Sequence, residues 1–419
     1  MREKLKALVV IALLVSGLSV SYYWLNVYSS DGDDSEEEAK YNPTESDLNH
    51  LVEGNNEFAF DLYHELDTDE NQFYSPWSIS SALVMTYEGA RGETAEEMKE
   101  VFGFPDNRSQ MREAYGFMHN RYNIEDMGIE MDTANSVWIN EDQEFPILDE
   151  YKFVLMNYYF SEVSTVDFIN QPAEACEEIN NWVFNNTDGK IEEIITVDDI
   201  DEWTRLVLVN AINFKGNWAF PFDEDNTQDA TFNTNQDEEV TAPFMRQEGT
   251  FNYTRTEDFE ILKKNYEGNE TSMLFVLPRE NSIDEVEEMI TLENMEEWRE
   301  DLEPTEMKLV SIPKFNLSTE YDLKEPLKEM GMPTAFTRDA NLSGMDGTES
   351  LFIQFVNHKT FIDVDEKGTK AAAATAVGVG RESADGRPAF IADQPFLSII
   401  QDDETGNILF MGQVNDPTE

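Results

Sequence analysis

The sequence predicts an α+β fold in one large body. Helical patterns dominate the first part of the chain, and most of the segments from Leu206 onward have the pattern of strands. The apolar run Leu206–Phe214 is nearly continuous, which is typical of a strand that is buried on both faces. No linker, composition break or internal repeat interrupts residues 47–419. Helices followed mainly by strands therefore indicate an α+β domain built around large sheets.

The individual elements follow from apolar spacing and from capping residues. Residues 47–66 repeat apolar side chains at the helical period, and Ser75-Pro76 opens a second helix. Thr94 precedes Ala-Glu-Glu and is expected to cap a third helix. A further helix is predicted at residues 172–186. Strands are predicted at residues 135–138, 160–166, 206–214, 251–254, 273–277, 308–312, 352–364, 390–391, 396–402 and 406–413.

The charge of the chain is extreme. Its 419 residues include 87 Asp and Glu against 29 Lys and Arg, which gives a formal net charge of −58. This charge repels nucleic acid phosphates and anionic lipid surfaces, so we expect no nucleic acid partner. The acidic residues are scattered along the chain, as in a solvated acidic surface. We interpret the protein as halophilic, because at ~1 M salt the Debye length falls to ~3 Å and the self-repulsion is screened.

Residues 1–28 have the pattern of a signal peptide or of an N-terminal membrane anchor. Basic residues at positions 2, 4 and 6 precede an apolar run from Ala7 to about Tyr28, which is long enough for a single span. No Ala-x-Ala cleavage site is evident, and the aromatic residues 22–24 sit where an interfacial belt would lie. Residues 29–46 are acidic and polar and read as a flexible tether. Both interpretations predict an extracellular or cell-surface body.

The sequence contains no constellation typical of catalysis or of metal binding. The histidines His50, His64, His119 and His358 lack metal-ligand spacing, and no H-E-x-x-H, C-x-x-C or G-x-S-x-G motif occurs. Cys176 is the single cysteine, which excludes an internal disulfide. We therefore expect no enzymatic activity, no cofactor and no metal. Six Asn-x-Ser/Thr sequons are acceptors for glycosylation outside the cell: Asn107, Asn185, Asn252, Asn269, Asn316 and Asn341.

The segment 364–377 combines signals for two conformations. Its alanines favour a helix, its threonines and valines favour a strand, and Gly368 supplies a pivot. No proline interrupts residues 366–387, so every backbone donor there can join a ladder. In a strand, alternate residues face opposite sides, and Thr369, Ala371, Ala373, Thr375 and Val377 would share one face. We interpret this segment as mobile and able to become a strand.

Short motifs in a fixed order carry a family resemblance. They are Asn71–Ser80, Ala82–Leu83, Tyr87–Ala90, Gly92–Thr94, Asn181–Trp182, Thr187–Ile191, Leu208–Ile212, Phe214–Trp218, Ile312–Phe315, Leu342–Met345, Glu366–Thr369 and Pro395–Phe396. In this order, from about Leu48 to Asp416, the chain resembles the serpins, the serine protease inhibitor family. The resemblance implies a serpin fold with three β-sheets, about nine helices and an exposed reactive centre loop.

The resemblance also implies a mechanism of inhibition. A target protease attacks the loop and forms an acyl-enzyme, after which the N-terminal part of the loop inserts into the central sheet and distorts the protease. The matching hinge consists of Glu366, Gly368, Thr369, Ala371, Ala372, Ala373, Ala374 and Thr375. Its small side chains favour a suicide-substrate inhibitor of serine endopeptidases, and we expect the protein to be a monomer. The alternative is a non-inhibitory serpin that acts as a binding, carrier or chaperone-like protein.

Two clusters below the loop are assigned by the same resemblance. The shutter, where the central sheet opens, matches Ser75, Ser78, Asn210 and His358. Buried polar groups need partners, and a small network can exchange partners as strands separate. Trp218 resembles the breach tryptophan at the top of the sheet. Each of these residues is expected to act in conformational change and not in catalysis.

The family's hinge register predicts the cleaved bond. Counting seventeen residues from Glu366 places the reactive bond at Glu382–Ser383. The segment up to Pro395 is about two residues longer than in many serpins, so Arg381–Glu382 is the alternative bond. The predicted partner is an extracellular serine protease that is trypsin-like, Glu-specific or subtilisin-like.

Overall fold

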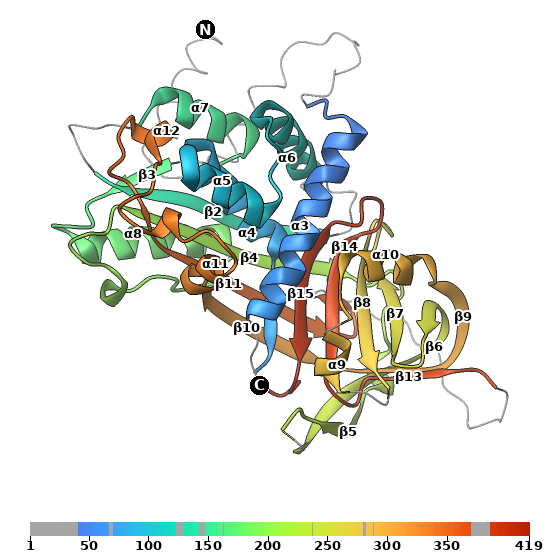
Figure 1. The fold of residues 1–419 in the computed structure, drawn as a ribbon. Helices are drawn as coiled ribbons and strands as arrows, with labels where there is room; N and C mark the ends of the chain where they lie inside the picture. Colours follow the sequence, from blue (N-terminus) through green and yellow to red (C-terminus); the bar gives the residue numbers. More distant parts are fainter. Residues whose placement is uncertain are drawn as a thin grey trace, which may run out of the picture. The chain divides into compact units, whose positions relative to one another are not determined.

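Two hydrogen-bonded β-sheets organise the part of the chain that the computed structural model describes (Figure 1). That part comprises residues 41–66, 70–122, 129–141, 147–161, 163–236, 238–279, 282–287, 289–369 and 386–419. The nine-stranded sheet has the order β1 (Gln72–Tyr74), β15 (Ile408–Val414), β14 (Phe396–Asp402), β8 (Thr271–Pro278), β7 (Phe259–Asn265), β6 (Glu239–Arg255), β9 (Glu303–Pro313) and β13 (Ala389–Ile391), with β5 (Gln228–Asn233) paired to β6. The six-stranded sheet has the order β10 (Phe315–Asp322), β11 (Ile353–Asp365), β12 (Gly368–Thr369), β4 (Leu206–Asn217), β2 (Ile129–Asn140) and β3 (Val163–Val166).

The helices precede the strands in the chain for the most part, as the sequence predicts. They are α3 (Glu45–Glu65), α4 (Pro76–Gly89), α5 (Gly92–Phe102), α6 (Arg108–Tyr122), α7 (Asp149–Tyr158), α8 (Pro172–Asn186), α9 (Ile283–Glu287), α10 (Leu292–Glu300), α11 (Lys324–Glu329) and α12 (Ser343–Asp346), with short 3₁₀ helices η2 (Val197–Asp199), η3 (Glu224–Asn226) and η4 (Thr334–Phe336). Ser75 caps α4, whose first residue is Pro76. The cap predicted at Thr94 is wrong, because α5 begins at Gly92 and the Thr94 hydroxyl accepts the Asn341 N–H (2.9 Å).

Strand β4 separates two hydrophobic cores, which explains its continuous apolar sequence. Leu208 and Ile212 face the larger core together with α4. Val207, Val209 and Ala211 face the smaller core together with α8. Helix α4 is buried nearly all round because it contacts β15 of one sheet and β2 and β4 of the other. A strand added beside β4 would therefore be covered on both faces.

The α+β fold class is confirmed, and one detail of the expectation differs. Three separate sheets are expected, but two of them form one continuous sheet, because the 17-residue strand β6 contributes to both. It pairs with β5 at its start, with β9 along its middle and with β7 at its end. One hydrogen-bonded network of nine strands results.

The body begins at Tyr41, six residues before the boundary predicted between 46 and 47. Tyr41 is buried, and its ring lies 6.0 Å from that of Tyr158. Thr44 and Asp47 form a capping box at the start of α3, so residues 41–46 belong to the body and not to a tether. The predicted apolar segment 7–28 falls outside the described residues. Among the described helices, none has the length and apolar character that a bilayer span requires.

Candidate functional site

The hinge is a hairpin at the C-terminal end of β11. The chain turns at residues 366–367, so that Gly368 and Thr369 pair antiparallel with the last residues of β11. The same two residues pair antiparallel with Asn217 and Gly216 of β4. Thr369 is completely buried between the two strands. The first residues of the predicted loop therefore already lie in the six-stranded sheet, between the C-terminal ends of β4 and β11.

Below the hinge, β4 and β11 are direct neighbours. Residues 206–213 of β4 pair in parallel with residues 353–361 of β11. Parallel pairing is slightly less stable per residue than antiparallel pairing. Strands β4 and β11 are thus paired directly up to residues 213 and 361, and they are already separated by residues 368–369 at their C-terminal ends.

Gly368 is required by the close approach of β4. Its φ is +148°, a conformation that side chains rarely adopt. A Cβ at this position would lie 2.1 Å from the carbonyl oxygen of Gly216, so β4 would have to move. The Asp365 carboxylate supports the turn by accepting the N–H groups of Lys367 (2.8 Å) and Gly368 (3.3 Å).

Glu366 anchors the turn below the surface. Its carboxylate accepts hydrogen bonds from the Thr227 hydroxyl (2.6 Å) and from Lys314 Nζ (2.7 Å). Burial alone would raise the pKa of Glu366, but these two donors outweigh burial and lower that pKa. The Glu366 carbonyl accepts the N–H of Phe222 (2.7 Å). The hinge is therefore held by both its side chain and its backbone.

Trp218, the predicted breach residue, holds the same turn from the other side. Its backbone N–H donates to the Lys367 carbonyl (2.8 Å) and its indole N–H donates to the Asp365 carbonyl (3.0 Å). The indole stacks on Tyr266 at 4.6 Å between ring centroids. The Tyr266 hydroxyl lies 3.1 Å from the hydroxyl of Thr369. Trp218 and Tyr266 thus pack against each other and contact the hinge through hydrogen bonds.

The four predicted shutter residues form one buried network. Ser75 Oγ donates to the Leu409 carbonyl (2.7 Å) and accepts the Ser78 N–H (3.1 Å). Asn210 Nδ2 donates to the carbonyl (2.8 Å) and to Oγ (2.6 Å) of Ser78. The side-chain oxygen of Asn210 is bonded to Nδ1 of His358. The network links α4, β4, β11 and β15, which are the elements that meet where β4 and β11 pair.

His358 is held as a neutral imidazole. Its Nε2 accepts the Ser75 N–H (3.1 Å), which places the ring proton on Nδ1, facing Asn210. Complete burial lowers the pKa of His358 to about 3. The residue therefore carries no charge near neutral pH and acts as a hydrogen-bonding link between β4 and β11.

Several contributors to the site carry no signal that periodicity could reveal. Asn135 of β2 donates to the Ser78 carbonyl (3.3 Å) and accepts the Ser78 hydroxyl (3.3 Å). Thr227 and Tyr266 contact the hinge from loops and strands far away in the sequence. Lys314, which binds the Glu366 carboxylate, is a further contributor. Of these additional residues, only Lys314 lies inside one of the sequence motifs, Ile312–Phe315.

Part of the predicted site lies outside the described residues. This applies to the reactive-bond residues Arg381, Glu382 and Ser383 and to the hinge residues Ala371, Ala372, Ala373, Ala374 and Thr375. Within the described ranges, no group of three or more His, Cys, Asp or Glu residues has the geometry of a metal site.

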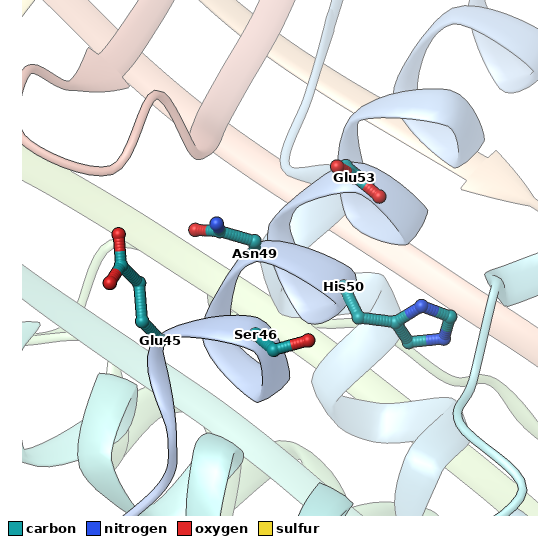
Figure 2. A pocket seen from close by; sticks show the side chains of 5 residues that line it. All are labelled: Glu45, Ser46, Asn49, His50 and Glu53. Atoms are coloured by element: carbon teal, nitrogen blue, oxygen red, sulfur yellow. The ribbon is translucent and has the colours of Figure 1, made fainter.

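A surface pocket lies elsewhere, at the start of α3. Figure 2 shows its lining side chains, Glu45, Ser46, Asn49, His50 and Glu53, all from one helix. None of them belongs to the hinge, the breach or the shutter.

Comparisons with known proteins agree with this arrangement. The family model described as Serpin (serine protease inhibitor) matches residues 53–417. An uncharacterized serpin-like protein of Methanosarcina acetivorans is 38% identical over 369 residues, which cover 88% of this chain and 86% of that protein. The leukocyte elastase inhibitor of Bos taurus is 36% identical over 382 residues, covering 88% of this chain and 100% of the relative. The crystal structure of human thyroxine-binding globulin has a TM-score of 0.80 and 31% identity, and covers 89% of this chain and 100% of that one.

The match extends over nearly the whole described body and includes the hinge, the breach and the shutter. The family model spans far more than half of the chain, and the relatives are covered over most of their own length. The protein belongs to the serpin family of serine protease inhibitors.

Proposed function

We propose that the protein inhibits serine proteases as a suicide substrate, by inserting the loop after Thr369 between β4 and β11. The observation that carries this proposal is the dual pairing of Thr369, with Gly216 on one side and Val364 on the other. The hinge thus starts a strand whose continuation needs only that β4 and β11 separate. Lys370 follows Thr369 directly, and the small residues 371–375 beyond it suit that path.

The pairing of Thr369 defines the register of the inserted strand. In an antiparallel ladder, each further loop residue moves one residue down both neighbours. Six residues after Thr369, Thr375 arrives opposite Asn210 and His358. On the same count, Thr369, Ala371, Ala373, Thr375 and Val377 face the larger core, beside Gly216, Phe214, Ile212, Asn210 and Leu208.

Insertion requires the shutter to exchange partners. The contact between Asn210 and His358 joins β4 to β11 and must break when a strand comes between them. The arriving Thr375 hydroxyl can donate to the Asn210 side-chain oxygen and accept from His358 Nδ1. Both buried polar groups then remain satisfied, which keeps the barrier to opening low.

The proposed chemistry is an arrested acyl transfer at Glu382–Ser383, with Arg381–Glu382 as the alternative bond. The protease serine oxygen bonds to the carbonyl carbon of the residue before the cleaved bond, and the peptide C–N bond breaks. The new amino terminus leaves with the proton that the protease base has taken from the serine. Insertion then carries the acylated protease along the sheet and distorts its active site, so that water does not hydrolyse the ester bond.

The test is incubation with trypsin-like, Glu-specific and subtilisin-like proteases in concentrated salt. We expect a covalent complex that survives denaturing electrophoresis with at least one class. The mass of the released C-terminal fragment identifies whether it starts at Ser383 or at Glu382. Cleavage of the loop by every class without any covalent complex would contradict inhibition.

The alternative is a carrier or other binding serpin. It is favoured by the likeness to thyroxine-binding globulin, whose crystal structure is of a complex with thyroxine. The protease panel separates the two functions, because a carrier is cleaved without being trapped.

We further propose that the protein acts outside the cytoplasm and in concentrated salt. The pattern of residues 1–28 supports the first part, either as a signal peptide or as a single-span anchor. The net charge of −58 supports the second part. The protease partner would then be an extracellular enzyme.

A further inference from the structure

Lys264 of β7 is a buried lysine without a carboxylate partner among the residues that the structure describes. Its exposed fraction is 3%. Its ammonium donates to the Phe220 carbonyl (2.7 Å) and to Gln247 Oε1 (3.2 Å). Buried charges are normally paired with an opposite charge, because removal from water is costly. Packing alone therefore does not account for a lysine at this buried position.

Three aromatic rings surround the ammonium. Nζ lies 4.2 Å from the ring centroid of Phe222, 5.2 Å from that of Trp218 and 5.5 Å from that of Phe251. Ring faces attract cations at such distances, most strongly where water is excluded. These ring contacts form a cage that offsets part of the cost of burying the charge of Lys264, but they do not neutralise it.

Most of this cage belongs to one short segment, residues 218–222, which we call the breach segment. Trp218, Phe220 and Phe222 supply three of the five contacts of Lys264. The same segment holds the hinge turn through three hydrogen bonds. Its donors are the Trp218 N–H, the Trp218 indole N–H and the Phe222 N–H, and the acceptors are the carbonyls of residues 367, 365 and 366.

We propose that Lys264 is a positioning residue for loop insertion, whose charge sets how readily the breach segment releases the hinge. Movement of the breach segment removes three contacts of the ammonium and admits water to it. Hydration favours the charged amine, so protonation of Lys264 favours the released hinge. The link to protease inhibition rests on the proposed function, whereas the coupling between Lys264 and the hinge does not.

The direction of the pH dependence follows from burial. Burial lowers the pKa of Lys264 from its ordinary value of 10.5 to about 7 in the closed hinge. A hydrated lysine in the released hinge regains a pKa near the ordinary value. Between these two values the released state binds more protons, so lowering the pH favours release by up to about tenfold per unit. Below about pH 7 both states are protonated, and the dependence levels off.

Other titratable groups around the cage have partners of their own. They are Glu366 with Lys314, Lys367 with Glu224, Arg246 with Gln228, and the Tyr266 hydroxyl with that of Thr369. Lys263, the neighbour of Lys264 on β7, pairs with Asp403 (2.9 Å). Burial lowers the pKa of His358 to about 3 and that of His119 to about 4, so neither titrates between pH 6 and pH 9.

The experiment measures hydrogen exchange of the breach segment without any protease. Peptides that cover residues 214–222 report the opening of the Trp218 and Phe222 amides, and each rate is divided by the intrinsic rate at the same pH. In the full-length protein in concentrated salt, we expect opening to increase by about tenfold from pH 8.5 to pH 7.5 and to level off below pH 7. Lys264→Met should remove this dependence and keep the segment closed.

Lys263→Met is the matched control, because it removes a lysine from the same strand but leaves the cage intact. It should keep the wild-type pH profile. Lys264→Arg keeps the charge at every pH and should give a flat profile at the open level. If Lys264→Met and wild type show the same pH profile, the inference is wrong, whether or not the protein inhibits a protease. If the profile depends on Lys264 and no protease is trapped, only the proposed function fails.

Discussion

Thr369 is the residue at which the loop meets the sheet. It is completely buried, and its only polar side-chain atom lies 3.1 Å from the Tyr266 hydroxyl. Such a position accepts a small side chain and excludes a charged one, because an unpaired buried charge costs several kcal/mol. The predicted preference for small hinge residues thus has its structural cause at this residue.

We expect Thr369→Arg to convert an inhibitor into a substrate. Each ~1.4 kcal/mol added to the insertion barrier slows insertion about tenfold, so hydrolysis of the acyl-enzyme wins. The measurement is the ratio of cleaved to trapped protein on a denaturing gel. Thr369→Val is the control, since it keeps the shape and loses one hydrogen bond worth ~1 kcal/mol. A trapped fraction of Thr369→Arg equal to that of wild type would refute insertion in this register.

Single residues of the site differ in how far the sequence reveals them. The shutter residues Ser75, Ser78, Asn210 and His358 came from a family resemblance, and the structure joins all four in one network. Tyr266 and Lys264 were not foreseen, because a strand pattern shows that a residue is buried but not which distant loop it touches. Burial of a lysine in particular runs against composition and needs the folded cage to be explained.

At the scale of elements, the contact between β4 and β11 controls the proposed opening. Ala211 and Lys359 are direct partners across these parallel strands. Cysteines at two such positions lie within the separation that a disulfide allows. A covalent link there closes the lower sheet without touching the hinge.

We expect the variant Ala211→Cys/Lys359→Cys, in a Cys176→Ala background, to lose inhibition when oxidised and to regain it when reduced. The oxidised sheet cannot admit a strand, so the loop is cut and the protease is released. The covalent complex is quantified before and after treatment with a reductant. The single variant Ala211→Cys should trap protease under both conditions. Equal trapping by the oxidised and reduced double variant would show that the loop does not enter between β4 and β11.

Elements were predictable where local signals were complete. Helix α8 has the predicted bounds because Pro172 starts it and an apolar stripe runs through it. Strand β4 is predictable from its nearly continuous apolar run, which reflects the burial of both of its faces. Helix α6, with arginines and glutamine among its apolar residues, and β10, with alternating exposed residues, were missed. Their apolar residues are too sparse to stand out before the neighbours that cover them are known.

At the scale of the whole molecule, acidic residues outnumber their possible partners. Arg121 alone contacts Asp402 (2.7 Å), Glu404 (2.8 Å) and Glu270 (3.5 Å), so one cation serves three carboxylates. With 87 acidic and 29 basic residues, most of the surplus charge can be relieved only by ions from solution.

We therefore expect the midpoint of thermal unfolding to fall when KCl is lowered from several molar to about 0.1 M, where the Debye length is ~10 Å. In domains of 150–250 residues each kcal/mol of stability corresponds to about 2–4 °C, so even a modest loss is visible in calorimetry. Sucrose is the control, because it favours burial without screening charge. Full recovery of stability by sucrose alone would argue against charge repulsion as the cause.

The direct pairing of β4 with β11 also sets a condition on how the chain folds. The hinge hairpin joins residues 364 and 369, only five positions apart, whereas the parallel pairs join residues such as 206 and 353, which are 147 positions apart (353 − 206). Contacts of long sequence separation form slowly, because a large loop must close first. The local hairpin between β11 and the residues that follow it therefore has time to lengthen along β11 before β11 pairs with the distant β4. The yield of the form in which β4 and β11 pair directly therefore depends on how fast these two distant strands meet.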